Sequence, residues 1–308
     1  MPLGPGNFPD LIEPGLRRVF DIATSRPRPM LGELFGEQAS TKMNEHYEGM
    51  GAMPKVPVFD GTVPYSDFAA GYKTTIKNYE FALGMVVERA LIDDEMYGVI
   101  NRRANSLGQT FGNTVEADAA DVFINAFTDG GTNRTGASTN GADGVALLST
   151  AHPRSPIDSG TTDSNEGTLD LNVPNVDTTR QNMANFTDDV GELLGVTADT
   201  ILVPTELERT ARQIFGRQAI WEPGSAQFDS NMFAGAMRVI VWNRLTDANA
   251  WFMIDSTQMK TNLIFQWRIR PEFARSEDFD GIQAKFRGYQ RYGIGWADWR
   301  WIHGQNPS

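Results

Sequence analysis

The spacing of apolar positions takes three successive forms along the first half of the chain. Residues Met1–Gly36 are rich in proline and glycine and hold one short amphipathic helical stretch, Gly15–Thr24. Met53–Arg89 alternates and predicts long antiparallel strands with apolar groups on both faces, a ribbon of marginal stability by itself. Asp93–Phe127 returns to spacings of three and four, which predicts one long helix with acidic residues at its start and a bend near Gly112. The arm and the ribbon have little core of their own, which favours a subunit that completes its core with its neighbours; docking of the arm on its own body is the alternative.

The second half of the chain predicts short elements separated by loops. Thr128–Asp177 is rich in glycine, threonine, serine and asparagine around one short apolar strand, Val145–Leu148. A helix is expected over Thr179–Leu194, and a buried strand over Thr200–Val203. A capping box then opens a helix over Thr205–Gly216. We therefore place a domain boundary at the start of the polar stretch.

The last third of the chain is rich in strands and aromatic residues. Strands are expected over Val239–Trp242, Trp251–Ile254, Leu263–Ile269 and Ile282–Trp301. All seven tryptophans lie at or beyond Trp221. The closing segment alternates basic or small residues with aromatic ones, which favours a strand held between two surfaces, in a core or at a subunit interface.

Composition and charge narrow the class of protein. The 308 residues are 40% hydrophobic and carry 27 basic and 39 acidic side chains, a net charge of −12. Such a surface repels nucleic-acid backbones, although a wall that encloses DNA without gripping it remains compatible with it. The absence of cysteine excludes disulfides, thiolate metal sites and cysteine nucleophiles. The chain has no apolar run of membrane-spanning length and no secretory signal at its start.

Candidate chemistry along the chain is weak. His46, His152 and His303 are far apart and lack a metal-ligand spacing, so we expect structural roles for all three. The glycine-rich stretch 130–144 lacks the lysine and helix start of a phosphate-binding loop. Ser149 lies close to His152, but no third member of a catalytic triad is recognisable. We therefore expect no catalytic, cofactor-binding or metal-binding residues and no enzymatic activity.

Three segments carry a family resemblance. Gly141–Pro153, with the sequence GADGVALLSTAHP, resembles a segment of Mu-like bacteriophage major head subunits. Thr200–Ala211 (TILVPTELERTA) is similar to the strand and helix that follow in that family, and Asn231–Asp255 is similar to its later pair of strands. The order and spacing of these segments extend the resemblance over roughly residues 35–303.

The resemblance implies an α+β protein with the Hong Kong 97-type (HK-97) capsid fold. In that fold an extended loop, the E-loop, lies over an adjacent subunit, and a spine helix runs through a peripheral domain. The implied division is 1–40 N-terminal arm; 41–92 E-loop ribbon and peripheral-domain strands; 93–130 peripheral-domain spine helix; 131–255 axial domain; 256–308 peripheral-domain return strands and final axial strand.

The function implied is that of the major capsid protein of a tailed double-stranded DNA bacteriophage. Its copies would form hexamers and pentamers of an icosahedral shell that encloses the genome without sequence-specific binding. The expected partners are a separate scaffolding protein, a portal and, as an optional further partner, a decoration protein. No cofactor and no membrane are involved, and the protein would reside in the virion head after assembly in the host cytoplasm.

Two alternatives remain open. One is an encapsulin-like cargo compartment of the same fold; the other is a carbohydrate-active enzyme or binding module built on the tryptophan-rich end. If the shell interpretation holds, aromatic residues of the arm, the ribbon and the C-terminal half are candidate intersubunit contacts: Phe20, Phe59, Tyr65, Phe68, Tyr72, Trp221 and Trp299.

Overall fold

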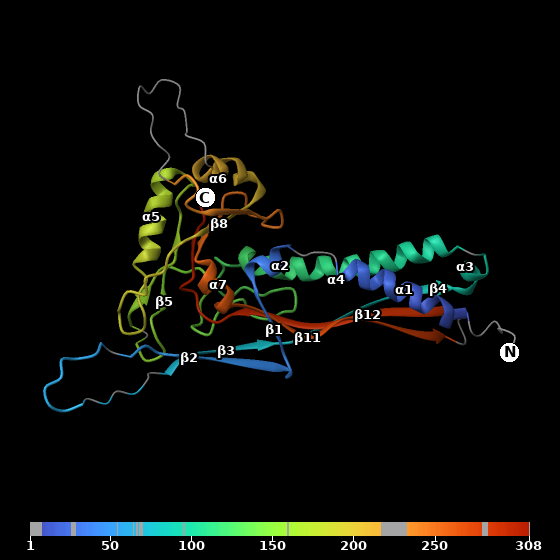
Figure 1. The fold of residues 1–308 in the computed structure, drawn as a ribbon, viewed down its shortest axis with the longest axis horizontal. Coiled ribbons are helices and arrows are strands. Elements are labelled where there is room, and N and C mark those ends of the chain that lie inside the picture. The colour runs from blue at the N-terminus through green and yellow to red at the C-terminus, as the bar shows by residue number, and fades with distance from the viewer. Residues whose placement is uncertain are drawn as a thin grey trace, which may run out of the picture.

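A computed structural model shows an elongated sheet joined to a compact sheet, with a long loop projecting beyond both (Figure 1). The structure describes residues 8–25, 29–53, 55–63, 65, 67, 70–94, 96–158, 160–216, 233–278 and 283–307.

The elongated sheet, called the long sheet below, has four strands in the order β1-β11-β12-β4. They are β1 (Gly36–Ala39), β11 (Leu263–Asp278), β12 (Gln283–Trp296) and β4 (Tyr79–Glu88). β1 runs parallel to β11, and the other neighbours are antiparallel. The two long strands β11 and β12 pair antiparallel along most of their length. Their cross-strand contacts stabilise the sheet, which offers one face for helix packing.

Two helices pack on one face of the long sheet: α1 (Phe8–Thr24) and α4 (Tyr97–Ile124). Phe20 of α1 is fully buried and contacts the rings of Phe111 in α4 and Phe273 in β11. A Cβ at Gly108 would lie 2.7 Å from the Cβ of Ala23, so glycine is needed where the two helices cross. The described part of the arm therefore docks on its own chain, and the expectation that it docks on a neighbour was wrong.

The opposite face of the long sheet is covered near its inner end by a two-stranded ribbon, β2 (Asn44–Met50) and β3 (Ala70–Lys77). The hydroxyl of Tyr47 donates to Gln266 Oε1 at 2.9 Å. The Gln266 amide donates in turn to the Ile76 carbonyl at 3.1 Å. The fully buried Gln266 thus fixes the ribbon on the sheet.

The compact sheet has five short strands in the order β7-β13-β10-β8-β9. They are β7 (Glu166–Gly167), β13 (Ile302–Gln305), β10 (Trp251–Ile254), β8 (Thr200–Val203) and β9 (Arg238–Val241). A separate pair, β5 (His152–Pro153) and β6 (Thr162–Asp163), lies beside it. The central strands β8, β10 and β13 are buried at every position, and burial on both faces accounts for the mostly apolar sequences of β8 and β10.

Short helices complete the compact end and the joints between elements. They are α2 (Pro29–Leu34), α3 (Arg89–Asp93), α5 (Val173–Ala184), the 3₁₀ turn η2 (Thr205–Leu207), α6 (Glu208–Phe215) and α7 (Ser256–Asn262). The Asp255 carboxylate caps α7 by accepting from the backbone N–H groups of Thr257 and Gln258.

Several expected boundaries need correction. The long helix begins at Tyr97 because a turn, closed by the Met96 N–H on the Leu91 carbonyl, separates it from α3; it stays helical through Gly112. The ribbon also begins earlier than expected, because its first strand, β2, precedes Met53. β4 was expected to belong to the ribbon, but it pairs with β12 in the long sheet. Val145–Leu148 is buried but irregular, with no ladder of its own.

The helix expected over Thr179–Leu194 is also misplaced. α5 ends at Ala184, and the chain then turns back through a loop in which Asp188 Oδ1 accepts from the backbone N–H of Val190 and of Glu192. This side-chain turn competes with helix formation. In the helix that starts near Thr205 no side-chain cap is made, so the expected capping box is absent.

Candidate intersubunit surfaces

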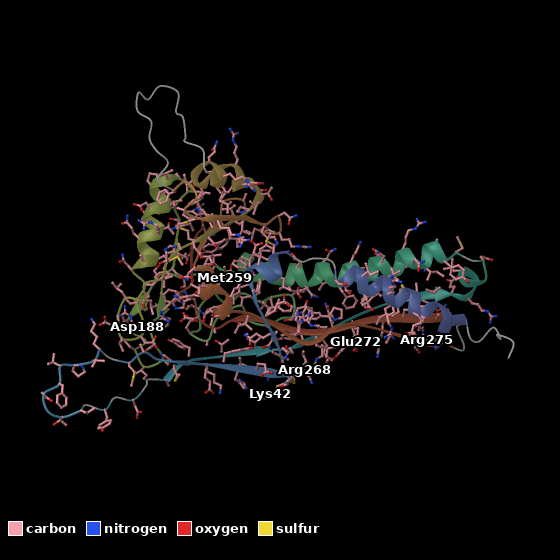
Figure 2. All side chains as sticks on the ribbon, viewed as in Figure 1. Lys42, Asp188, Met259, Arg268, Glu272 and Arg275 are labelled. Carbon is pink, nitrogen blue, oxygen red and sulfur yellow. The ribbon has the colours of Figure 1, made fainter. Side chains whose placement is uncertain are left out.

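The loop that joins β2 to β3 is the most exposed apolar segment in the described part of the chain. Its side chains stand free of the rest of the molecule in Figure 2. Val56 and Tyr65 are each 95% exposed, and Val58, Phe59 and Val63 are also exposed. Burying such side chains fully is favourable by roughly 1.5–3 kcal/mol each, which makes the loop a strong candidate for contact with another molecule.

The base of this loop is fixed to its own chain. Lys55 Nζ lies 2.6 Å from Glu192 Oε2 on the loop after α5, and the Tyr72 hydroxyl donates to the Pro153 carbonyl at 3.3 Å. Burial raises the pKa of Tyr72, so the hydroxyl keeps its proton at neutral pH. These contacts anchor the two ends of the loop, and the apolar side chains between them project into solvent.

A second apolar surface lies at the foot of the compact end. It consists of Ile157, Val190, Leu193 and Leu194, all exposed. Asp188 begins the loop that carries three of them, close to the start of the projecting loop (Figure 2). Arg300 supports this loop from below: its guanidinium donates to the Thr187 carbonyl at 2.9 Å and to Asp189 Oδ1 at 3.2 Å.

The histidine of the Gly141–Pro153 segment is part of a buried polar network. His152 Nδ1 lies 2.6 Å from Asp143 Oδ2, and its Nε2 lies 3.0 Å from Asn165 Oδ1. The Asn165 amide donates to the carbonyls of Leu147 and Ile302, so its oxygen must face the imidazole. Both ring nitrogens are therefore engaged, and the imidazole joins loops to β13 rather than acting as a base or a metal ligand.

The other two histidines also have structural surroundings. His46 Nδ1 lies 2.9 Å from Thr75 Oγ1 on the exposed ribbon. His303 on β13 is buried beside the ring of Phe186, and burial lowers its pKa to about 4. The expectation of structural roles is consistent with all three positions.

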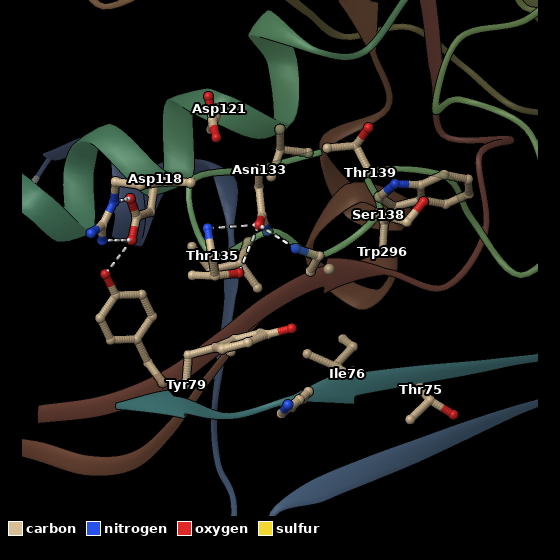
Figure 3. Close-up of a pocket in the computed structure, with 18 of the residues that line it drawn as sticks. Thr75, Ile76, Tyr79, Asp118, Asp121, Asn133, Thr135, Ser138, Thr139 and Trp296 are labelled. Carbon is tan, nitrogen blue, oxygen red and sulfur yellow. Dashed lines mark hydrogen bonds and ion pairs between the residues drawn. The ribbon is translucent and has the colours of Figure 1, made fainter. Parts of the chain in front are cut away.

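A cleft of about 320 Å³ lies between α4, the 130–141 loop, β12 and strand β3 of the ribbon (Figure 3). On its wall Asp118 accepts from the Arg134 guanidinium at 2.6 and 2.8 Å and from the Tyr292 hydroxyl at 2.5 Å. Burial, reinforced by the Asp118 carboxylate, raises the pKa of Tyr292 well above its usual range. Asp118 interrupts the apolar stripe of the helix because it ties three elements together.

Metal, membrane and stacking sites gain no support within the described residues. They contain no group of three or more histidine, aspartate or glutamate side chains placed to hold a metal ion. Among the helices described, none is both long and apolar enough to cross a bilayer. The described tryptophans are all buried, so they form no exposed aromatic platform: Trp242, Trp251, Trp267, Trp296, Trp299 and Trp301.

The sequence profile of a family described as phage capsid protein matches residues 71–303, which is most of the chain. The chain belongs to the phage capsid protein family. It is therefore a virion component. No curated protein matches the sequence.

Solved structures show the same fold at low sequence identity. The capsid of bacteriophage JBD30 has a TM-score of 0.58 at 16% identity, covering 72% of this chain and 92% of that one. The mature capsid of bacteriophage PhiM1 has a TM-score of 0.58 at 11% identity, with 92% and 88% covered. A virus-like particle from Pyrococcus furiosus has a TM-score of 0.52 at 10% identity, with 95% and 98% covered. The JBD30 capsid is also similar as a procapsid and when decorated with minor capsid protein trimers.

Family and fold together confirm the Hong Kong 97-type α+β capsid fold expected from the sequence. They make the chain a major capsid protein, a subunit that forms an icosahedral shell.

The structure divides the candidate contact residues of this capsid protein into three groups. Phe20 and Trp299 are buried within their own chain, Trp299 stacked on His152 at 4.4 Å, so neither can meet a neighbour and both assignments were wrong. Phe59 and Tyr65 are exposed on the projecting loop and stay predictions. The remaining three stay predictions as well: Tyr72 is half-buried at the base of the loop, and Phe68 and Trp221 lie outside the described residues.

Sequence reasoning missed the second apolar surface of the capsid protein. Val190, Leu193 and Leu194 belong to the segment expected as the end of a helix, but they are exposed on a loop. A signal was present, because Asp188 and Gly191 flank Val190, and Gly191 adopts φ +86°, which favours glycine.

Proposed function

We propose that this capsid protein builds the head of a tailed double-stranded DNA bacteriophage of the Mu-like kind, and that its copies form the pentamers and hexamers of the shell. The observation that carries the proposal is the projecting loop, whose apolar side chains are left exposed by the described part of the chain although the base of the loop is anchored. The Mu-like assignment is supported by the sequence of the Gly141–Pro153 segment, which carries the resemblance; in the structure its His152 and Asp143 form a buried pair.

The division into functional regions follows from this proposal. The long sheet with α1 and α4 serves as the peripheral domain, and α4 is its spine helix. The compact sheet with α5 and α6 serves as the axial domain, where copies meet around the five-fold and six-fold centres. The ribbon β2–β3 and its loop serve as the E-loop, which reaches a neighbouring subunit.

The partners beyond the chain itself are a scaffolding protein, a portal and a decoration protein, with assembly in the host cytoplasm. The decorated JBD30 capsid supports a decoration partner by likeness of fold. The role is structural and not enzymatic. Support comes from the engaged nitrogens of His152, the paired carboxylate of Asp118 and the buried tryptophans, which leave these groups no free chemistry.

Negative-stain microscopy combined with size-exclusion chromatography tests the proposal. We expect the purified protein to elute as capsomers or in the void volume and to show closed, regular shells. A protein of 34.1 kDa that elutes as a monomer at all concentrations and never forms shells in the presence of its scaffold would contradict the proposal.

A second candidate is a shell that stores protein cargo; a virus-like particle from Pyrococcus furiosus has the same fold, so the fold alone does not separate this candidate from a phage head. The contents of purified particles separate the two functions. Nuclease-resistant double-stranded DNA of uniform length indicates a phage head, whereas a co-purifying enzyme in fixed ratio indicates a cargo compartment.

A further inference from the structure

The long sheet has a free edge at β4. Over Tyr79–Glu88 this strand pairs with β12, and among the described residues no strand pairs with its other side. The strand has ten residues, against four in β9 and two in β7, the edge strands of the compact sheet. Unpaired edges of this length are templates for another extended chain.

The other side of the long sheet shows how an edge is protected. Beyond β1, the outer half of β11 also has no strand paired with this side among the described residues, but it carries Pro271 and two register shifts between Trp267 and Glu272. Charged side chains follow along it: Arg268, Arg270, Glu272 and Arg275. Proline, bulges and charge all discourage strand addition. β4 contains no proline, no lysine and no register shift.

One hydrogen bond fixes which backbone groups of β4 point outward. Arg103 Nη1 donates to the Val86 carbonyl at 3.3 Å, so the backbone of Val86 faces away from β12. Backbone groups alternate along a strand, so Glu80, Ala82 and Gly84 face the same way. All three are exposed, and Ala82 and Gly84 are small enough to let another backbone approach.

The projecting loop offers an extended segment that matches this edge. Residues 55–63 form no ladder in their own chain and carry the exposed side chains of Val56, Val58 and Phe59. Pro57 lacks an N–H, but strand addition uses the N–H of alternate residues, and Val56 and Val58 both retain theirs. The segment projects at the opposite end of the molecule from the middle of β4, so it cannot reach its own edge (Figure 1).

We propose that residues 55–63 of one subunit add as a strand to the free edge of β4 in a second copy of this chain. The inference rests on the proposed function, because a shell is what places one copy beside another. Main-chain hydrogen bonds to Glu80, Ala82 and Gly84 fix the register, and Val58 and Phe59 cover the exposed Leu83 and Val86.

Disulfide trapping in assembled shells tests the proposal directly, because the chain contains no cysteine. Ala82→Cys is combined in turn with Val56→Cys, Val58→Cys and Asp60→Cys. We expect at least one pair to give covalent multimers on a non-reducing gel after mild oxidation, reversed by reductant. Dissociated subunits of the same variant should stay monomeric, because only assembly holds the loop of one copy beside the β4 edge of another.

The matched control replaces Ala82→Cys by Ala117→Cys, an exposed alanine on α4. We expect no multimers with this control. If shells form and the three Ala82 pairs stay uncrosslinked, or if Ala117 crosslinks instead, the loop docks elsewhere and the inference is wrong. Absence of shells from the unmodified protein would be the failure of the proposed function.

A proline substitution gives an independent test. The Ala82 N–H points outward, so Ala82→Pro removes a donor from the free edge and leaves the hydrogen bonds to β12 in place. We expect unassembled Ala82→Pro subunits to keep the far-ultraviolet spectrum of the wild type and the yield of shells to fall at least tenfold, whereas Ala82→Ser, which keeps the N–H, assembles normally. Shells of Ala82→Pro at wild-type yield would refute the inference.

Discussion

The compact end and the projecting loop use similar apolar side chains in opposite ways. Trp251 and Trp301 are fully buried in the compact end, whereas Val56 and Tyr65 on the loop are each 95% exposed. The compact end closes its core within one chain, because side chains of its central strands pack in one buried cluster with side chains of α4, α5 and α6. The loop is fixed only at its foot, by Lys55 and Tyr72, so its apolar surface awaits another molecule.

The difference separates folding from assembly. Apolar surface that is buried within the chain contributes to the free energy of unfolding of each subunit. Apolar surface that is left open contributes only when copies meet, and it then adds to association. A substitution should therefore act on one of these two quantities according to the region in which it lies, and measurements of both on the same variant test the separation.

The largest effect on folding is expected for Trp301→Ala. The ring is fully buried and lies 6.5 Å from that of Phe123, in the core that joins α4 to the compact sheet. Truncating a buried aromatic side chain costs about 3–5 kcal/mol through lost burial and an unfilled cavity. Urea unfolding of unassembled subunits, followed by circular dichroism, measures the loss. Tyr65→Ala on the loop is the control and should change the free energy of unfolding by less than about 0.5 kcal/mol.

A pH effect of intermediate size is expected from His303. Burial lowers its pKa to about 4 in the folded chain, from an ordinary value of 6.5. The unfolded chain therefore binds a proton more readily, and stability is full above pH 6.5 and falls as the pH drops from 6.5 toward 4. Between pH 7 and 5 the contribution is about 2 kcal/mol.

Unfolding curves at pH 7 and 5 check this effect. His303→Gln should reduce the loss between the two pH values by that amount, whereas His46→Gln, at the exposed ribbon position, should keep the wild-type loss. Equal pH dependence of wild type and His303→Gln would mean that other groups account for the acid sensitivity.

A smaller effect is expected at the cleft between α4, the 130–141 loop and β12. Asp118→Ala removes the acceptor of the Tyr292 hydroxyl and of Arg134. Leaving the buried hydroxyl without a partner costs about 1–3 kcal/mol. Tyr292→Phe removes the hydroxyl itself, so the double variant should be less destabilised than the sum of the single ones. Strict additivity in urea unfolding would show that the two groups are not coupled.

Much of the compact end was predictable because its signals are local. The strand over Thr200–Val203 is a continuous apolar run, and Trp251–Ile254 is another; both are buried at every position. The helix after β8 and its end near Gly216 were also found. The error over Thr179–Leu194 arose because helical spacing persists past Ala184, while Asp188 and Gly191 impose a turn.

The placement of the candidate contacts was less predictable, since it depends on contacts between distant segments. The arm helix was identified, but its partner could not be read from spacing, and Phe20 packs on Phe111 and Phe273 within the same chain. Gly108 marks that crossing, although a glycine inside a helix has several explanations. The apolar residues of the loop were recognised, but the pattern could not tell that Val58 and Phe59 lie on a loop without ladder partners.

The loop variant Val58→Asp with Phe59→Asp should give the smallest change in the free energy of unfolding. Its effect on assembly should be large. Both side chains are exposed, so unassembled subunits should unfold within about 0.5 kcal/mol of the wild type. In the shell, two charged groups would replace apolar ones at a buried contact. A loss of about 1.4 kcal/mol per contact already weakens association tenfold, and the loss repeats at every copy. Particle yield, measured by sedimentation, should therefore fall far more than tenfold.

The conservative variant Val58→Ile with Phe59→Leu keeps the apolar surface and should assemble. If the charged variant forms shells at normal yield, the loop is not an assembly surface, and the contrast between a closed core and an open loop has no functional meaning.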